Sequence, residues 1–219
     1  MEQNKKSWAD YYVGHKRNLS NIVLHYPYLF AILWRRPRTI LEIGCGSADH
    51  SMFLKKQFPK LEISFLDNDE KILATAKSTY QNCVSNTYLV NILDNKEVQS
   101  IPPFDVIMSQ GLMEHFENAE FIRIIDNFRG KAGDFIFSIP SNYYPTRDFG
   151  NEILRSKKEV TDLLNTIPEI RYNVSGYFDI GLKTKLVGAK EKKGIYQKLK
   201  FIFFCSNHIL VNVSYLGKR

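Results

Sequence analysis

The segment with the clearest chemical potential is Gly44-Cys45-Gly46, which follows the apolar run 40–43 and precedes a helical pattern at 48–58. Glycine has no side chain, so a loop of this kind lets a ligand approach the backbone closely. In open α/β sheets, ligands bind at the carboxyl ends of the strands, which is where this loop falls. The spacing therefore predicts a cofactor site that begins at these glycines.

The identity of residue 49, an aspartate, indicates which class of cofactor this loop can bind. A dinucleotide fingerprint would have glycine or alanine at its position. A carboxylate there opposes close packing of the helix on the strand and adds negative charge near a pyrophosphate. Asp49 therefore disfavours a nicotinamide oxidoreductase, which we keep as an alternative. It does not disfavour a cofactor that carries a positive charge and no phosphate.

Two further polar residues lie at the ends of expected strands. Asp67 closes the apolar run 63–66, and its carboxylate can accept hydrogen bonds from two hydroxyl groups. The alternative role for Asp67 is helix entry, but Asp69 already fills that role as an N-cap. We expect the Asp67 carboxylate to be mostly exposed. Asn91, near the end of the run 88–92, can bind a ligand amino group or the following turn.

Apolar runs alternate with helical patterns after Pro37, which predicts βαβ units and an α/β fold with a mostly parallel, seven-stranded sheet and helices on both faces. The expected strands are 40–43, 63–66, 88–92, 104–109, 135–139, 171–178 and 208–215. The expected helices are 48–58, 69–79, one that begins with Asn118 as its cap, and 156–165.

These motifs, in this order, resemble the class I S-adenosylmethionine-dependent methyltransferases that act on small molecules. Similar to that family are Glu42-x-Gly44-x-Gly46-Ser47, the strand-end Asp67, Phe104-Asp105-Val106-Ile107-Met108-Ser109 and Leu112-Met113-Glu114-His115. The likeness covers about residues 40–140. It implies a Rossmann-like fold, S-adenosylmethionine as cofactor with S-adenosylhomocysteine as product, and methyl transfer by in-line displacement. A non-catalytic cofactor-binding protein of the same fold is the second alternative.

The resemblance also implies a set of cofactor contacts. They are Glu42, Gly44, Cys45, Gly46, Asp67, Asn68, Asn91, Ile92 and Ser109. Within this set, Glu42 would either hold the loop or bind the methionine amino group, and Asp67 would bind the ribose. We expect Cys45 to pack in the core and not to act as a nucleophile.

The acceptor side is less well defined by the sequence. His115 is the candidate general base, because imidazole titrates near neutral pH; its alternative role is to cap the next helix or close the pocket. The other candidates for the substrate pocket are Tyr11, Tyr12, Glu114, Tyr143 and Tyr144. No metal is expected. The fourth strand is not followed by an Asn/Asp-Pro-Pro-aromatic signature, and no nucleic-acid module is evident, so we expect a small-molecule acceptor.

The flanks complete the predicted organisation: a helical cap at 1–36 and a methyltransferase domain at 37–219. The nearly apolar run 22–34 is too short to span a bilayer, and Pro27 is expected to divide the cap into two helices. A basic insertion at about 181–205 holds seven lysines against one glutamate. It would contact an anionic membrane, attract an acidic substrate, or pack as a helix with its lysines in water.

The cysteines and the N-terminal residues of the sequence indicate in which cellular compartment the protein is expected. The three cysteines are widely spaced and form no disulfide framework or metal-binding pair. The stretch 1–10 is polar and lacks the apolar region of a signal peptide. A cytoplasmic protein is therefore expected.

Overall fold

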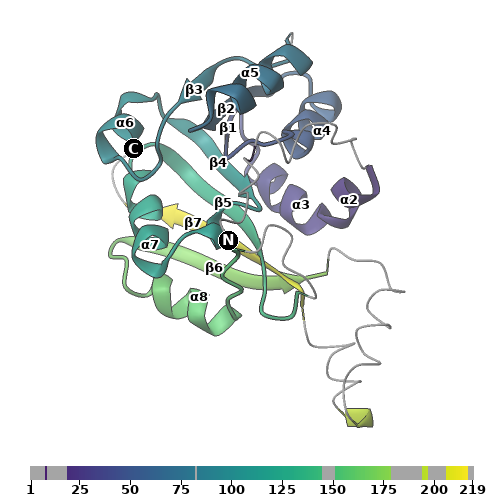
Figure 1. The fold of residues 1–219 in the computed structure, drawn as a ribbon, viewed down its shortest axis with the longest axis vertical. Coiled ribbons are helices and arrows are strands. Elements are labelled where there is room, and N and C mark those ends of the chain that lie inside the picture. The colour runs from purple at the N-terminus through teal and green to yellow at the C-terminus, as the bar shows by residue number, and fades with distance from the viewer. Residues whose placement is uncertain are drawn as a thin grey trace, which may run out of the picture.

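A seven-stranded sheet forms the centre of the computed structural model, which describes Trp8 and residues 19–81, 83–144, 151–178, 194–196 and 206–216. The strand order is β3-β2-β1-β4-β5-β7-β6 (Figure 1). The strands are β1 (Thr39–Ile43), β2 (Glu62–Asp67), β3 (Thr87–Leu89), β4 (Phe104–Gln110), β5 (Ala132–Pro140), β6 (Ile170–Tyr177) and β7 (His208–Tyr215). All neighbours pair in parallel except β7, which is antiparallel to both β5 and β6. The predicted mostly parallel sheet is confirmed.

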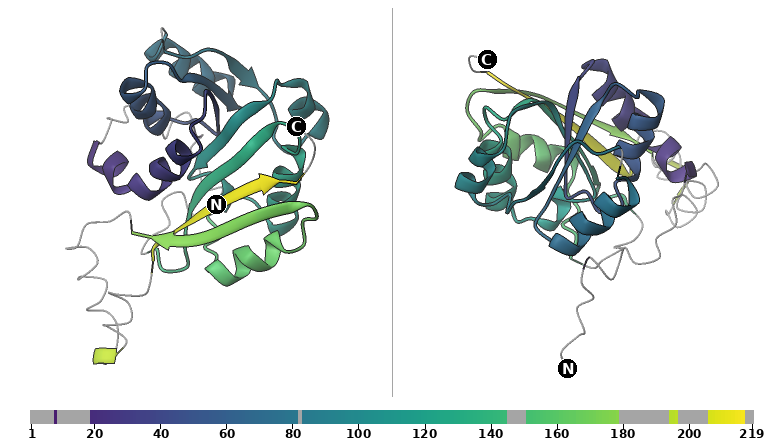
Figure 2. Two further views of the ribbon diagram at one scale, coloured as in Figure 1. Left: turned by 180° about the vertical axis from the view of Figure 1, so that it is seen from behind. Right: turned by 90° about the horizontal axis from the view of Figure 1, so that it is seen from above.

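Helices cover both faces of this sheet (Figure 2). They are α2 (Leu19–Leu24), α3 (Tyr26–Trp34), α4 (Asp49–Gln57), α5 (Glu70–Thr79), α6 (Asn95–Ser100), α7 (Asn118–Asn127) and α8 (Lys157–Leu164). Buried residues of α2 to α5 share one apolar cluster with one face of the sheet. Those of α6 to α8 share a second cluster with the other face. Because alternate residues of a strand face opposite sides, six of the strands contribute to both clusters, while the short β3 contributes Tyr88 to the second cluster alone.

The N-terminal helices pack directly on the sheet. As predicted, the N-terminal segment is divided into two helices near Pro27, which lies in the first turn of α3. Proline is tolerated there because a backbone N–H at this position would have no partner inside the helix. Tyr28, Leu29 and Ile32 are buried, and α3 contacts β5 and β7. Whether residues 1–36 form a separate cap stays a prediction. None of the helices in the described ranges is long and apolar enough to cross a membrane.

Helix caps are mostly where the sequence places them. The Asp69 side chain accepts hydrogen bonds from the Lys71 and Ile72 amides and begins α5. The predicted Asn118 cap is wrong. Glu117 caps α7 in a reciprocal capping box with Glu120, because a carboxylate one residue earlier reaches the same free amides of the first turn.

Two further elements differ from the sequence prediction. The third strand ends at Leu89, and the remainder of the run 88–92 forms a turn although Val90 and Ile92 are buried. The short helix α6 was not expected; the Asp94 side chain caps it by accepting from the amides of residues 96 and 97. Of the predicted insertion 181–205, only residues 194–196 lie within the described ranges.

Candidate functional site

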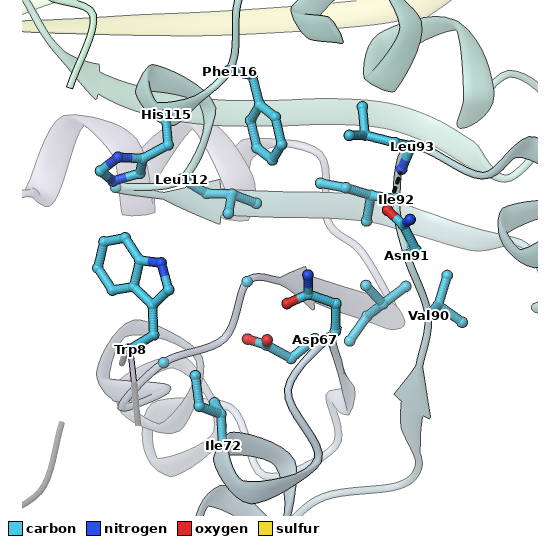
Figure 3. Close-up of a pocket in the computed structure, with 15 residues that line it drawn as sticks. Trp8, Asp67, Ile72, Val90, Asn91, Ile92, Leu93, Leu112, His115 and Phe116 are labelled. Carbon is cyan, nitrogen blue, oxygen red and sulfur yellow. Dashed lines mark hydrogen bonds between the residues drawn. The ribbon is translucent and has the colours of Figure 1, made fainter. Parts of the chain in front are cut away.

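A pocket of about 270 Å³ lies at the carboxyl ends of β1, β2 and β4 (Figure 3). This volume is near the lower end of the range for small-molecule sites, about 300–1,000 Å³. The lining residues are Trp8, Gly44, Gly46, Leu66, Asp67, Asn68, Ile72, Val90, Asn91, Ile92, Leu93, Gly111, Leu112, His115 and Phe116. The pocket brings together the predicted glycine loop, strand-end acid and third-strand turn.

The glycine loop forms the floor of the pocket in a conformation that favours glycine. Gly44 and Gly46 have φ of 61° and 47°, a region that L side chains rarely adopt. The Gly44 amide donates to the Leu66 carbonyl at 2.8 Å, which ties the loop to β2. A Cβ atom at Gly44 would lie 2.8 Å from both Cδ atoms of Leu112. The missing side chain is therefore required for the close approach of these two pocket walls.

The Asp67 carboxylate reaches the pocket from the end of β2 (Figure 3). One carboxylate oxygen accepts from the Asp69 amide at 3.0 Å. Burial raises the pKa of Asp67, while backbone hydrogen bonds from Asp69, Asn68 and Gly46 oppose that rise. The expectation of a mostly exposed carboxylate is wrong: the residue is 7% exposed, because the turn into α5 folds over it.

Asn91 lies on the neighbouring wall, just after Val90, whose amide donates to the Asp67 carbonyl at 3.0 Å, and it adopts the turn that the sequence left as an alternative. Its side-chain oxygen accepts from the Leu93 amide at 3.0 Å. Its backbone amide donates to the Glu97 carboxylate at 2.7 Å. Helix α6 thus fixes the position of Asn91 on the pocket wall. A contact from Asn91 to an adenine edge stays a prediction.

His115 closes the far end of the pocket from a short 3₁₀ turn, Met113–His115. Its Nδ1 lies 2.7 Å from Oδ1 of Asn151, and its ring contacts Trp8 edge-on with centroids 4.9 Å apart. Burial lowers the pKa of His115, and hydrogen bonds to Asn151 and the Gly111 backbone, with the charge of Glu152, oppose the effect. The imidazole is therefore neutral near pH 7 and held on several sides.

Arg155 ties the chain after β5 to this wall. Its guanidinium donates to the Phe116 carbonyl at 2.6 Å and to Asn118 at 3.0 and 3.2 Å. The Ile153 amide donates to the Glu114 carbonyl at 2.7 Å. These bonds hold Asn151 beside His115. The contact between His115 and Asn151 could not be predicted from the sequence, because the two residues are 36 positions apart.

Several predicted site residues do not line this pocket. Glu42, Cys45 and Ser109 are buried but are absent from its wall, since their side chains point into the layers above and below the sheet. Glu114 is buried behind the 3₁₀ turn, while Tyr143 is 42% exposed. The remaining candidates are Tyr144, which contacts the His208 ring, and Tyr11 and Tyr12, which lie outside the described residues. Their roles stay predictions.

Glu42 has an unusual environment for a carboxylate. It is 4% exposed, and one carboxylate oxygen has no hydrogen-bond partner in the described part of the chain. Burial raises the pKa of Glu42 to about 8, against the opposing hydrogen bond of Ser51. Glu42 is therefore largely protonated at pH 7. Its neighbours are Ser51 and Asp49 of α4 and Tyr28 of α3, so the choice between holding the loop and binding the methionine amino group stays a prediction.

Comparison with known proteins agrees with this architecture. Residues 40–130 match the family described as "Methyltransferase domain". Over 94 residues the chain is 34% identical to ribosomal RNA small subunit methyltransferase C of Buchnera aphidicola, covering 42% of this chain and 28% of that protein. Over 146 residues it is 25% identical to malonyl-(acyl-carrier protein) O-methyltransferase 1 of Ilyobacter polytropus, covering 64% and 47%. The chain thus spans less than half the length of these curated relatives.

Solved structures share the fold at low sequence identity. The plantazolicin methyltransferase BamL, in complex with a desmethyl-plantazolicin analogue and S-adenosylhomocysteine, has a TM-score of 0.63 at 13% identity, covering 96% of this chain and 90% of that one. A methyltransferase of Archaeoglobus fulgidus described as dependent on S-adenosylmethionine has a TM-score of 0.65 at 16% identity, covering 91% and 94%. At these identities the likeness establishes the fold.

Proposed function

We propose that this member of the class I S-adenosylmethionine-dependent methyltransferase superfamily binds S-adenosylmethionine in the described pocket and transfers its methyl group to a small-molecule acceptor. The observation that carries the proposal is the charge of the pocket. Asp67 lines it, whereas no lysine or arginine is found among the lining residues in the described ranges. A cationic, phosphate-free cofactor suits such a wall, and a dinucleotide pyrophosphate does not.

The residues present fit this cofactor. Gly44 and Gly46 line the pocket with backbone alone, which would let the methionine part approach closely, and the Asp67 carboxylate can accept from ribose hydroxyls. Ile92, Leu93 and the opposite wall provide apolar surface for a purine ring. When bound, S-adenosylmethionine supplies an already activated methyl group. The chain then has to orient an acceptor beside the methyl group and keep water out. Holding the two reactants close together in the right orientation can account for a large part of the rate enhancement.

His115 is the side chain best placed to influence an acceptor proton. Burial keeps the imidazole neutral at pH 7 by lowering its pKa, and Asn151 holds its orientation at 2.7 Å. A neutral, oriented imidazole can accept a proton when the acceptor loses one. Trp8 lines this end of the pocket and packs edge-on against the imidazole ring.

Two alternative functions, a nicotinamide oxidoreductase and a non-catalytic cofactor-binding protein, can be distinguished from a methyltransferase by binding and activity measurements. A nicotinamide oxidoreductase is disfavoured by Asp49, which lies in the first turn of α4 and accepts hydrogen bonds from Ser47 and Tyr80. A non-catalytic binding protein would bind cofactor but methylate nothing. The relatives are named for ribosomal RNA and for a carrier-protein-bound malonyl group, so an acceptor screen includes both beside small molecules.

A cytoplasmic setting stays a prediction; Cys45 and Cys83 are free thiols.

We expect S-adenosylhomocysteine and S-adenosylmethionine to bind with micromolar dissociation constants, roughly 7–8 kcal/mol. Isothermal titration calorimetry on the full chain measures this directly. NADH and NADPH serve as matched controls and are expected to give no heat. No heat with S-adenosylhomocysteine up to millimolar concentration, or tighter binding of a nicotinamide cofactor, would contradict the proposed function.

Replacing Asp67 by asparagine is expected to weaken S-adenosylhomocysteine binding by about 1.5–3 kcal/mol, which is roughly 10- to 150-fold. The amide keeps the shape and the bond to Asp69 but loses one charged acceptor for the ribose. Glu70→Gln, at an exposed neighbouring position, is the control and should bind like the wild type. If a folded Asp67→Asn protein binds S-adenosylhomocysteine as tightly as the wild type, Asp67 does not contact the cofactor.

A further inference from the structure

Helix α3 is apolar or aromatic on all its sides, yet the described fold covers only one of them. Its sequence, YPYLFAILW, contains no charged residue. Tyr28, Leu29 and Ile32 face the sheet and are buried. A helix that is hydrophobic all round is normally enclosed on every side. The outer side of α3 therefore has the composition of an interaction surface.

The outer sides of α2 and α3 form one continuous stripe. Val23, Tyr26, Phe30 and Trp34, which we call the aromatic stripe, are 54, 68, 61 and 71% exposed. Within α3, the four-residue spacing of Tyr26, Phe30 and Trp34 places them on one helical face, and the rings of Phe30 and Trp34 lie 5.7 Å apart. Val23 is exposed at the end of α2, just before this face begins. Figure 1 shows α2 and α3 beside the central strands, at the right-hand periphery of the fold.

The chain that follows the aromatic stripe is positively charged. Arg35, Arg36 and Arg38 are all exposed, and there is no aspartate or glutamate between residues 19 and 41. Acidic groups near this end come from other strands: Asp134 pairs with Arg35 at 3.4 Å, and Asp105 accepts from the backbone amide of Arg38. The charge of Arg38 also acts on the Asp105 carboxylate, whose pKa it helps to lower. Among the described residues, Arg36 is therefore the one of these three arginines that has no acidic partner, although all three side chains are exposed.

We propose that the aromatic stripe docks on an anionic membrane surface. Tyrosine and tryptophan side chains prefer the headgroup region of a bilayer, and arginines beside them bind acidic lipid headgroups. Helix α3 has nine residues, too few to cross a bilayer, so it lies along the surface. A second copy of the same basic face would bring like charges together, whereas an anionic lipid surface is complementary. This proposal does not depend on the cofactor or the acceptor.

The test is co-sedimentation of the full chain with phosphatidylcholine vesicles, with and without phosphatidylglycerol, at low salt. We expect binding to the anionic vesicles, weakened by high salt because screening reduces charge attraction. Phe30→Ser with Trp34→Ser is expected to reduce the partition coefficient at least tenfold. Arg36→Gln with Arg38→Gln should reduce it on anionic vesicles only. Leu89→Ser is the matched control, since Leu89 is 56% exposed on β3, at the opposite edge of the sheet.

Three results would overturn the proposal. The first is no binding of the wild type to anionic vesicles at low salt. The second is equal binding of wild type and the Phe30/Trp34 variant, which would assign lipid binding to another segment. The third is a wild-type dimer in light scattering that the same variant converts to a monomer, which would show that a second copy covers the aromatic stripe. Circular dichroism checks that the exposed substitutions leave the fold intact.

Discussion

Replacing Gly44 by alanine is expected to weaken S-adenosylhomocysteine binding by about 3 kcal/mol, more than a hundredfold. The added Cβ would lie 2.8 Å from the Leu112 side chain, which is below van der Waals contact. The Leu112 side chain, which also lines the pocket, must then shift and change the shape of that wall. The positive φ of Gly44 adds backbone strain of about 1–2 kcal/mol to the folded state. Calorimetry and urea unfolding measure the two effects separately.

Gly130 offers a matched control for this prediction. It also has a positive φ, 77°, but a Cβ there meets nothing within 4 Å. Gly130→Ala should therefore lose similar stability and keep wild-type affinity. Combining Gly44→Ala with Leu112→Ala should restore part of the binding, because the collision is relieved. If Gly44→Ala binds as tightly as Gly130→Ala, the glycine floor is not part of the cofactor site.

Replacing Glu42 by glutamine is expected to stabilise the empty protein by about 3 kcal/mol at pH 7. The carboxyl group holds its proton in the folded state, where burial raises its pKa to about 8, and is ionised at pH 7 in the unfolded chain. A carboxyl group whose pKa is raised in the folded state costs the protein no stability below its pKa in the unfolded chain, near 4.5. As the pH rises from there toward 8, the unfolded chain ionises first and the folded state loses stability relative to it. Glutamine is neutral at every pH and removes this loss.

Urea unfolding between pH 4.5 and 8.5 tests the prediction. The advantage of Glu42→Gln should be near zero at the acid end and largest at the alkaline end. Glu62→Gln, at the exposed start of the neighbouring strand, should change stability by less than about 0.5 kcal/mol throughout. A constant difference between Glu42→Gln and wild type across the pH range would disprove the buried, protonated carboxyl. If Glu42 only holds the loop, the variant keeps its affinity for S-adenosylhomocysteine; a large loss would instead indicate a contact with the methionine amino group.

The sequence predicted elements well where hydrophobic periodicity decides the structure. Strands with buried runs, such as β1 and β4, begin and end within a residue or two of their expected bounds. The third strand was predicted too long because Val90 and Ile92 are as apolar as strand residues. Both side chains are buried in the apolar cluster on the α6–α8 side of the sheet, and the last backbone hydrogen bond to β2 is the one that the Val90 amide donates to the Asp67 carbonyl. Helix α6 was missed because it buries only Val98 and so has no apolar periodicity.

The candidate site was predictable where it depends on local sequence and not where it depends on distant contacts. Gly44, Gly46 and Asp67 lie at strand ends, and the parallel order of β1 and β2 brings them together. Asn151 reaches His115 only through the chain after β5, and no periodicity encodes that contact. Glu42 was assigned to the cofactor by resemblance, but strand alternation turns its side chain into the layer occupied by α3 and α4.

The placement of the two tryptophans gives this protein two separate optical reporters. Trp8 lines the pocket beside His115, and Trp34 is exposed on the outer side of α3; the sequence contains no third. Emission from Trp8 alone, in a Trp34→Phe protein, will follow ligands that enter the pocket. Emission from Trp34 alone, in a Trp8→Phe protein, will shift to the blue when the outer surface leaves water. Two single-tryptophan variants of this chain, neither carrying a label, can thus report separately on its interior and its exterior.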